Sequence, residues 1–338
     1  MGKRVSARRT LVATALFCLS WPAQSALADI PVATASVGDP WQSGAADCTT
    51  HPVPPLEVRA YDSQTFVLRQ SLCSTFEAPF IYLLIGKSRA LLIDTGDLAD
   101  PVAMPLAQTV FTLLRRGGGS QPPLLVVHTH RHLDHRAGDP QFVGQANVEV
   151  VPYELAGIQR YYKFTDWPNS RVQIDLGERT VDVIPTPGHN ETDLAFYDRT
   201  TALLFSGDFP LAGRLLIDDT DAARASARRL VEFVKEKPVA AVLGGHIEMD
   251  VSGNLLPWKS EIHPGERSLP MDKSWLLKLP AALDEFNGVY SETDGFVMEN
   301  SMRVLALIGV AALGALVALI VGIVRFRRRA VRRALRQS

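Results

Sequence analysis

Groups that bind metal ions recur after the apolar runs of this chain, and they constrain its fold more than any other feature of the sequence. The densest group occupies residues 130–135, where three histidines and Asp134 follow the apolar run Leu124–Val127. His189, Asp208 and His246 come later, each after a run with the composition of a strand. Imidazole nitrogens and carboxylate oxygens are ligands that zinc prefers, and they also suit iron and manganese. The sequence therefore predicts a metal centre at a sheet edge, where the loops after several strands meet.

The number of candidate ligands indicates two ions. The candidates are His130, His132, Asp134, His135, His189, Asp208 and His246. Two sites of three ligands each use six of these seven groups, and a carboxylate that bridges both ions accounts for the seventh. Such three-ligand sites leave coordination positions of the metal open for water. Open positions are typical of catalytic metals and not of structural ones. We therefore expect two divalent ions, with zinc as the first candidate and iron or manganese as alternatives.

His128 is excluded from this ligand set. It lies at the end of a predicted strand, two residues before the cluster, and we interpret it as a packed, hydrogen-bonded histidine. For the cluster itself the alternative is a solvated histidine-rich loop. Three imidazoles and a carboxylate within six residues, together with the later candidates, argue against that alternative.

Hydrophobic patterns predict a single domain dominated by strands. Apolar runs predict strands at residues 65–68, 80–85, 90–94, 124–128, 148–151, 171–174, 181–186, 194–198, 202–206 and 239–243. Helical spacing predicts helices at residues 102–115, stopped by the glycines at 117–119, and at residues 221–235. We interpret residues 29–55 as a loosely packed lead-in, residues 56–265 as the domain, and residues 266–303 as a juxtamembrane connector.

The order of these motifs resembles the metallo-β-lactamase superfamily, over roughly residues 56–263. The five matching positions are Asp94 in Asp94-Thr95-Gly96, the cluster at 130–135, His189, Asp208 and His246. The resemblance implies an α+β fold, the αββα four-layer sandwich, with the metals at one edge of the paired sheets. It implies a first ion on His130, His132 and His189, a second on Asp134, His135 and His246, and Asp208 as the bridge. Asp94 would orient ligands without touching a metal.

The chemistry expected of such a centre is hydrolysis. A water held between two dications loses a proton near neutral pH and can attack a polarised carbonyl or phosphoryl group. Asp134 is the candidate catalytic residue, because it can bind metal and also orient the attacking oxygen and handle its proton.

The expected substrate is a small molecule. The presence of Asp208 favours an ester, thioester, lactone or phosphodiester, since true lactamases of the superfamily generally lack the bridging aspartate. β-Lactam hydrolysis stays the alternative, followed by a di-iron redox protein or a non-catalytic metal-binding factor. Substrate-binding residues are not determined by the sequence. Six side chains are candidates for the lining of the substrate pocket, and we interpret each of them as a surface or packing residue: Tyr161, Tyr162, Trp167, Arg214, Glu248 and His263.

The two termini predict export and a membrane anchor. Residues 1–28 have a basic start, an apolar core and the small-x-small sequence Ala26-Leu27-Ala28, which is typical of a signal peptide; an uncleaved anchor is the alternative. Residues 304–324 carry no charge and precede seven arginines within 325–338. This predicts one span of the cell membrane, a basic cytoplasmic tail and an extracytoplasmic or periplasmic catalytic domain. Gly314, Ala318 and Gly322 predict at most a weak homodimer.

Cysteines and net charge complete the expectations. Removal of residues 1–28 takes Cys18 away and leaves Cys48 and Cys73, which we expect to form a disulfide after export; two unpaired thiols are the alternative. The formal net charge of −1 provides no basic field, so no nucleic acid partner is expected.

Overall fold

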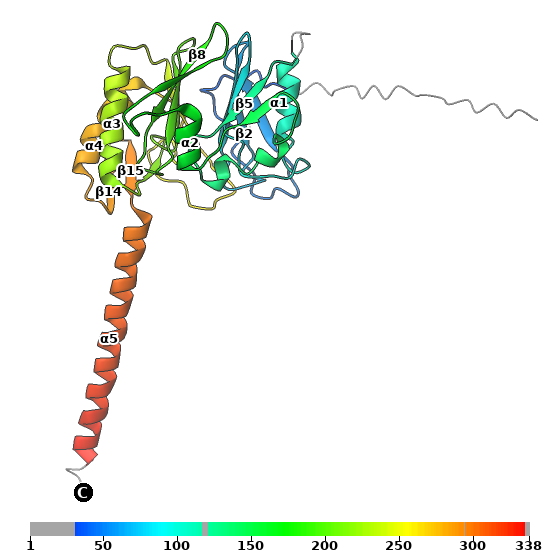
Figure 1. The fold of residues 1–338 in the computed structure, drawn as a ribbon. Coiled ribbons are helices and arrows are strands. Elements are labelled where there is room, and N and C mark those ends of the chain that lie inside the picture. The colour runs from blue at the N-terminus through cyan, green and yellow to red at the C-terminus, as the bar shows by residue number, and fades with distance from the viewer. Residues whose placement is uncertain (1–30, 117–120, 294, 335–338) are drawn as a thin grey trace, which may run out of the picture.

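Two six-stranded sheets form the centre of the molecule in this computed structural model, which describes residues 31–116, 121–293 and 295–334 (Figure 1). The first sheet has the order β1-β2-β3-β4-β5-β6, and its strands are β1 (Leu56–Ala60), β2 (Thr65–Gln70), β3 (Phe80–Ile85), β4 (Ala90–Ile93), β5 (Leu124–Val127) and β6 (Val148–Val150). The second has the order β13-β12-β10-β9-β8-β7, with β7 (Val172–Asp175), β8 (Thr180–Pro185), β9 (Leu194–Asp198), β10 (Leu203–Gly207), β12 (Ala241–Gly244) and β13 (Pro270–Met271). Pairing is antiparallel except for β4-β5-β6 and β10-β12, which are parallel.

Strand alternation divides the apolar side chains between the layers. In β3, Tyr82 and Leu84 point into the core between the two sheets, whereas Ile81 and Leu83 point to the outer face of the first sheet. Both sets are fully buried, because a helix layer covers each outer face. The strand sequences are therefore apolar at successive positions and do not alternate between apolar and polar residues.

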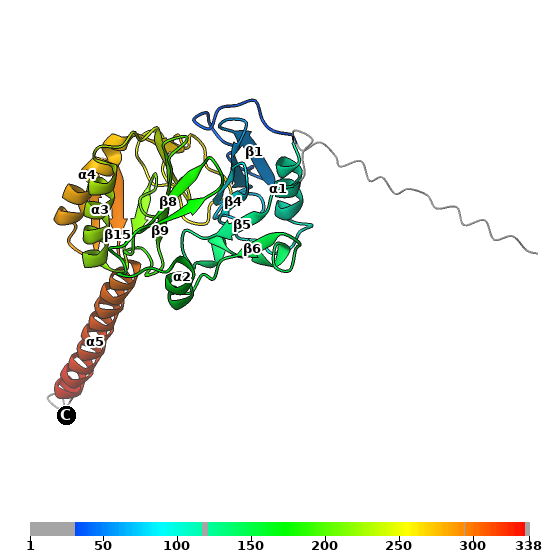
Figure 2. The same cartoon turned by 45° about the horizontal axis from the view of Figure 1, so that its top comes forward.

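Helices cover the two outer faces, as Figure 2 shows. Helix α1 (Leu106–Leu114) packs on the first sheet, and α3 (Thr220–Val234) and α4 (Lys273–Glu285) pack on the second. The Asp219 side chain caps α3 by accepting hydrogen bonds from the backbone of Asp221 and Ala222, each at 3.0 Å. The predicted αββα four-layer sandwich of the α+β class is confirmed.

Residues 270–299 differ from the connector that the sequence suggested. They form β13, α4, β14 (Tyr290–Thr293) and β15 (Phe296–Glu299), and β15 pairs with β11 (Arg214–Leu216) in a third, three-stranded sheet. Leu276, Leu279 and Leu283 on one face of α4 are completely buried on the second sheet. Each buried leucine contributes roughly 2 kcal/mol of hydrophobic free energy, so this segment is part of the core. The sequence does not reveal this segment, because Pro280 lies inside α4 and the strands are short.

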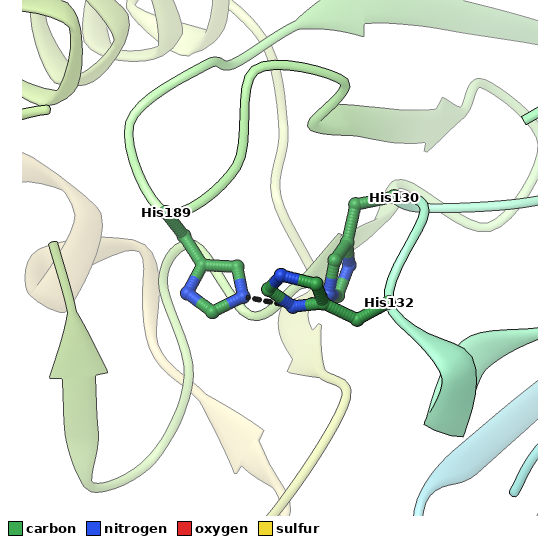
Figure 3. Close-up of side chains that lie close together, drawn as sticks. All are labelled: His130, His132 and His189. Carbon is green, nitrogen blue, oxygen red and sulfur yellow. Dashed lines mark hydrogen bonds between the residues drawn. The ribbon is translucent and has the colours of Figure 1, made fainter. Parts of the chain in front are cut away.

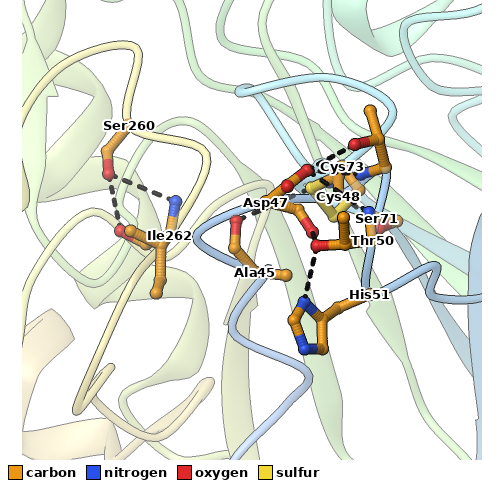
Figure 4. Close-up of a disulfide and its surroundings, with 10 residues drawn as sticks. Ala45, Asp47, Cys48, Thr50, His51, Ser71, Cys73, Ser260 and Ile262 are labelled. Atoms are coloured by element: carbon orange, nitrogen blue, oxygen red, sulfur yellow. Dashed lines mark hydrogen bonds between the residues drawn. A yellow bond between two sulfur atoms is a disulfide. The ribbon is translucent and has the colours of Figure 1, made fainter.

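The lead-in is also packed more tightly than expected. Trp41 is 4% exposed and lies against Phe80, and the guanidinium of Arg59 lies 3.9 Å from the Trp41 ring centre. Cys48 and Cys73 form the expected disulfide, which joins this segment to the turn after β2 (Figure 4). The lead-in is therefore held by a cross-link and by buried aromatic contacts.

Smaller differences concern individual elements. Helix α1 begins at Leu106 and not at residue 102, since Pro105 occupies its N-cap, and α2 (Leu155–Tyr162) was not predicted. The remaining predicted strands and the helix at 221–235 agree with the structure to within two residues. The predicted signal peptide and the glycines at 117–119 lie outside the described residues.

Helix α5 (Ser301–Ala334) leaves the sandwich and extends away from it (Figures 1 and 2). Within the described residues, its part Ser301–Arg329 is the one helix long and apolar enough to cross a membrane, by length and composition, and its most apolar window is not buried. The predicted span at residues 304–324 lies within it.

Candidate metal centre

The candidate ligands lie in loops at the carboxyl ends of β5, β8, β10 and β12, strands of both sheets. Crowding at this edge explains the glycine before His246. A Cβ on Gly245 would lie 2.4 Å from Asp208 Oδ1 and 2.8 Å from His135 Cε1, so a side chain there would enter the site. The loops that carry His135, Asp208 and His246 can approach one another because residue 245 has no side chain.

The first group of ligands consists of three imidazoles (Figure 3). His132 Nδ1 lies 2.9 Å from His130 Nε2 and 3.0 Å from His189 Nε2. A neutral imidazole has one donor and one acceptor nitrogen, so three converging nitrogens cannot satisfy one another fully. A divalent cation satisfies all three lone pairs at once.

The second group consists of Asp134, His135, His246 and Asp208. Asp134 Oδ2 lies 3.2 Å from both His135 Nε2 and His246 Nε2, and these two nitrogens are themselves 3.2 Å apart. Two imidazoles and two carboxylates form a donor set that suits a divalent ion.

Asp208 lies between the two groups. Its Oδ2 is 3.6 Å from His189 Nε2 and 3.9 Å from His130 Nε2, whereas its Oδ1 is 3.4 Å from His135 Nε2 and 3.6 Å from His246 Nε2. Oδ1 is buried and accepts no hydrogen bond from the described part of the chain. A buried carboxylate oxygen without a partner is costly, and a cation at this point removes that cost. The residues therefore fit a pair of divalent ions.

The ring nitrogens that face away from the centre are held by the protein. His135 Nδ1 contacts Asp94 Oδ2 at 2.9 Å, His189 Nδ1 donates to the Leu216 carbonyl at 3.0 Å, and His246 Nδ1 donates to the Glu77 carbonyl at 2.7 Å. Asp94 is completely buried and also accepts hydrogen bonds from the backbone and the hydroxyl of Thr129. Such contacts fix the tautomer and aim the opposite nitrogen at the metal position.

The two groups differ in their electrostatics. Burial lowers the pKa of His130 and of His132, so these imidazoles are neutral near pH 7. Burial acts in the same direction on His246, but Asp208 and Asp134 outweigh it and raise the pKa of His246 to about 10. Carboxylates likewise raise the pKa of His135 above its ordinary value, against the effect of burial. In the absence of metal, His135 and His246 therefore hold protons, whereas His130 and His132 do not.

A cavity of about 440 Å³ opens onto the ligands. Arg214 and Glu248, two of the side chains weighed from the sequence, line it, and Arg214 Nε lies 3.8 Å from Glu248 Oε2. The sequence reasoning did not single out the other lining residues, which include Glu77, Leu211, Leu216, Trp258, Glu299, Ser301, Val304 and Leu305. Most of these come from segments without a motif, so no sequence signal identified them.

The other side chains weighed for the pocket have structural roles. Tyr161, Tyr162 and Trp167 pack on the core between the sheets. His263 contacts Glu266 at 2.8 Å. His128 is buried and its Nε2 lies 2.8 Å from Asp139 Oδ1, as expected of a packed, hydrogen-bonded histidine.

Known proteins resemble the region that carries this centre. The family described as "Metallo-beta-lactamase superfamily" matches residues 74–246, just over half of the 338 residues. "Acyl-coenzyme A thioesterase MBLAC2" of Gallus gallus is 29% identical over 205 residues, 50% of this chain and 72% of that protein. "N-acyl homoserine lactonase" of Bacillus cereus is 27% identical over 220 residues, 52% of this chain and 84% of that protein. The solved "Metallo-beta-lactamase from Pontibacter korlensis" is 20% identical with a TM-score of 0.48, covering 68% of this chain and 100% of that one.

Proposed function

Since the chain belongs to the metallo-β-lactamase superfamily and is a metal-dependent hydrolase, we propose that it is an exported, membrane-anchored enzyme with two divalent ions. Its substrate is a small ester, thioester or lactone, with a phosphodiester as the next candidate. Zinc is the proposed metal, because nitrogen and carboxylate ligands suit it.

The position of Asp208 supports this proposal more than any other observation. Each oxygen of its carboxylate faces a different ligand group, and the buried Oδ1 has no hydrogen bond among the described residues. We assign His130, His132 and His189 to the first ion and Asp134, His135 and His246 to the second, with Asp208 between them. Asp94 holds His135 in position.

When bound, two such ions supply an activated water and polarise the scissile carbonyl. Asp134 takes the proton-handling role in this proposal. It lines the cavity with Oδ2 beside His135 and His246, and its side chain is 20% exposed, so substrate and water can reach it. In the absence of metal, His135 and His246 outweigh the effect of burial and hold the pKa of Asp134 below its ordinary value.

Arg214 provides a positive charge on the substrate side. Its side chain lines the cavity, and its buried Nε donates no hydrogen bond to any of the described residues. The guanidinium lies beside the Glu248 carboxylate, and we assign it to an oxygen of the substrate because desolvation strengthens such a contact.

The relatives favour cleavage at a carbonyl carbon. Their names state a thioesterase and a lactonase, both of which break a bond next to an acyl carbon. Such relatives support hydrolysis over a di-iron redox role or a non-catalytic role. Asp208 favours these bonds over β-lactams, which stay the alternative substrate.

The membrane anchor is proposed from α5. Its window of mean hydropathy 2.9 and the arginines after residue 324 support one span with the tail in the cytoplasm. Export through residues 1–28 then places the catalytic domain on the extracytoplasmic side, where the Cys48–Cys73 disulfide is stable.

A substrate panel tests the function. Purified full-length chain loaded with zinc is assayed on an ester, a thioester, a lactone, a phosphodiester and a β-lactam, with and without a chelator. We expect turnover of at least one acyl substrate, its loss on chelation and its recovery with zinc. Turnover that survives complete metal removal would refute the proposal.

A further inference from the structure

The first turn of the proposed membrane helix forms part of the wall of the metal-site cavity. Ser301, Val304 and Leu305 line the same cavity as His189 and Asp208. Val304 is half-buried, and Leu305 is 61% exposed. The substrate cavity and the helix are therefore adjacent.

Hydrogen bonds fix this turn to the catalytic domain. The Asn300 side-chain amide donates to the carbonyls of Ile217 and Asp218 at 2.7 and 3.1 Å, and its oxygen caps α5 by accepting from the backbone of Arg303 at 2.9 Å. The preceding strand β15 pairs with β11, which carries Arg214 and Leu216 of the cavity wall. The helix start is thus tied to the cavity wall by the hydrogen bonds of the Asn300 side chain and by the pairing of β15 with β11.

The apolar wall and the apolar span begin at the same residues. Val304 and Leu305 are the first two residues of the uncharged run 304–324, and Arg303 is the last charge before it. Arginine next to a span lies at the headgroup level of a bilayer. The cavity therefore borders the residues at which the proposed span begins.

An exposed tryptophan lines the same cavity. Trp258 lines the cavity, is 68% exposed and has the Lys259 ammonium 4.7 Å from its ring centre. Tryptophan with a neighbouring lysine is typical of the membrane–water interface.

The cavity is lined by both charged and apolar side chains. Its wall carries the candidate ligands, Arg214 and three glutamates, Glu77, Glu248 and Glu299, and it also carries the apolar side chains of Leu211, Leu216, Val304 and Leu305. The acyl chain of an amphiphilic ester or thioester would bury apolar surface against Val304 and Leu305.

We propose that the substrate is an acyl ester or thioester resident in the membrane, which enters from the bilayer with its acyl chain against the first turn of α5. This rests on the hydrolase and the anchor proposed above. Water adds to the acyl carbon and the bond to the leaving oxygen or sulfur breaks. The products are a fatty carboxylate, an alcohol or thiol that has taken up a proton, and one released proton.

The route is tested with the zinc-loaded full-length chain in phosphatidylcholine vesicles. 4-Methylumbelliferyl palmitate is placed either in the same vesicles or in separate ones, and the soluble acetate ester serves as the second probe. We expect palmitate cleavage in the same vesicles to be faster by about tenfold or more, whereas acetate is cleaved in both arrangements.

The outcomes separate the two proposals. Cleavage of acetate with equal palmitate rates in both arrangements, or a chain that does not float with vesicles, overturns the membrane route alone. A loaded enzyme that cleaves neither ester nor any member of the substrate panel refutes the hydrolase proposal itself.

A matched pair of variants tests the wall. Val304→Trp narrows the cavity at its apolar wall, so the ratio of kcat/KM for palmitate to that for acetate should fall about tenfold. Val310→Trp makes the same change further along the span, outside the cavity, and should keep the wild-type ratio. Equal ratios in the two variants would contradict the proposed position of the acyl chain.

Discussion

The two ligand groups lie on either side of one carboxylate, yet they hold charge differently. His130, His132 and His189 are all imidazoles, and burial keeps the first two neutral. The other group has Asp134 and shares Asp208, and its histidines hold protons when no ion is present. The difference indicates that the imidazole group would bind a cation through its nitrogen lone pairs, whereas the group with Asp134 would attract a cation through its negative charge.

Asp208→Asn should have the largest effect, because it alters both halves at once. The amide keeps the shape but removes the charge, and its NH2 group would point at one set of ligands. We expect activity to fall to background and the chain to bind fewer than two ions. Metal analysis and turnover on the same sample measure both. Wild-type turnover in this variant would exclude Asp208 as the bridge.

Asp134→Asn should affect one half only. We expect a loss of about 10²–10⁴-fold in kcat, the range typical of a proton-handling group. The ion held by the three imidazoles should remain. A variant with an unchanged kcat would remove Asp134 from the mechanism, and circular dichroism checks that the fold is kept.

Asp94→Asn should have a smaller effect, since Asp94 acts through His135. A loss of roughly 10- to 100-fold in metal affinity is expected, as for other residues that orient ligands. The loss should concern the ion on the Asp134 side, and excess zinc should restore activity. Equal weakening of both ions would contradict the assignment of Asp94 to His135.

The smallest effect concerns protons released during metal uptake. A raised pKa means that His246 keeps its proton as the pH rises toward about 10, so below that pH an incoming ion must displace it. His189→Ala leaves the carboxylate-rich group and should release protons on binding zinc, whereas His246→Ala leaves the imidazole group and should release fewer. Calorimetry in two buffers of different ionisation enthalpy measures the difference. Equal release by the two variants would contradict the comparison.

The sequence predicts a metal centre because metal chemistry restricts its ligands to a few residue types, and the structure brings the predicted residues together. Each ligand follows a buried strand, and β5 and β10 were recognisable as apolar runs. The seven candidate ligands lie in two groups, each of which could hold a metal ion. The position of Asp208 between the two groups depends on the orientation of its side chain, which the sequence does not determine.

The parts that the sequence missed have weak local signals. Helix α4 contains Pro280, β13 has two residues, and β15 acquires its meaning only by pairing with the distant β11. Arg59 illustrates the same limit, since its guanidinium donates to three carbonyls of the lead-in, those of Ser36, Asp39 and Pro40. Contacts between residues far apart in the chain determine these elements and contacts, and hydrophobic periodicity in the sequence does not predict them. The cavity wall formed by Val304 and Leu305 belongs to this class.

Metal stoichiometry against activity tests the central claim most directly. Metal-free full-length chain is titrated with zinc while bound metal is measured by mass spectrometry and turnover is followed. We predict two ions per chain, with full activity only after the second equivalent. Full activity with one ion or with none would contradict a centre in which Asp208 joins two metals.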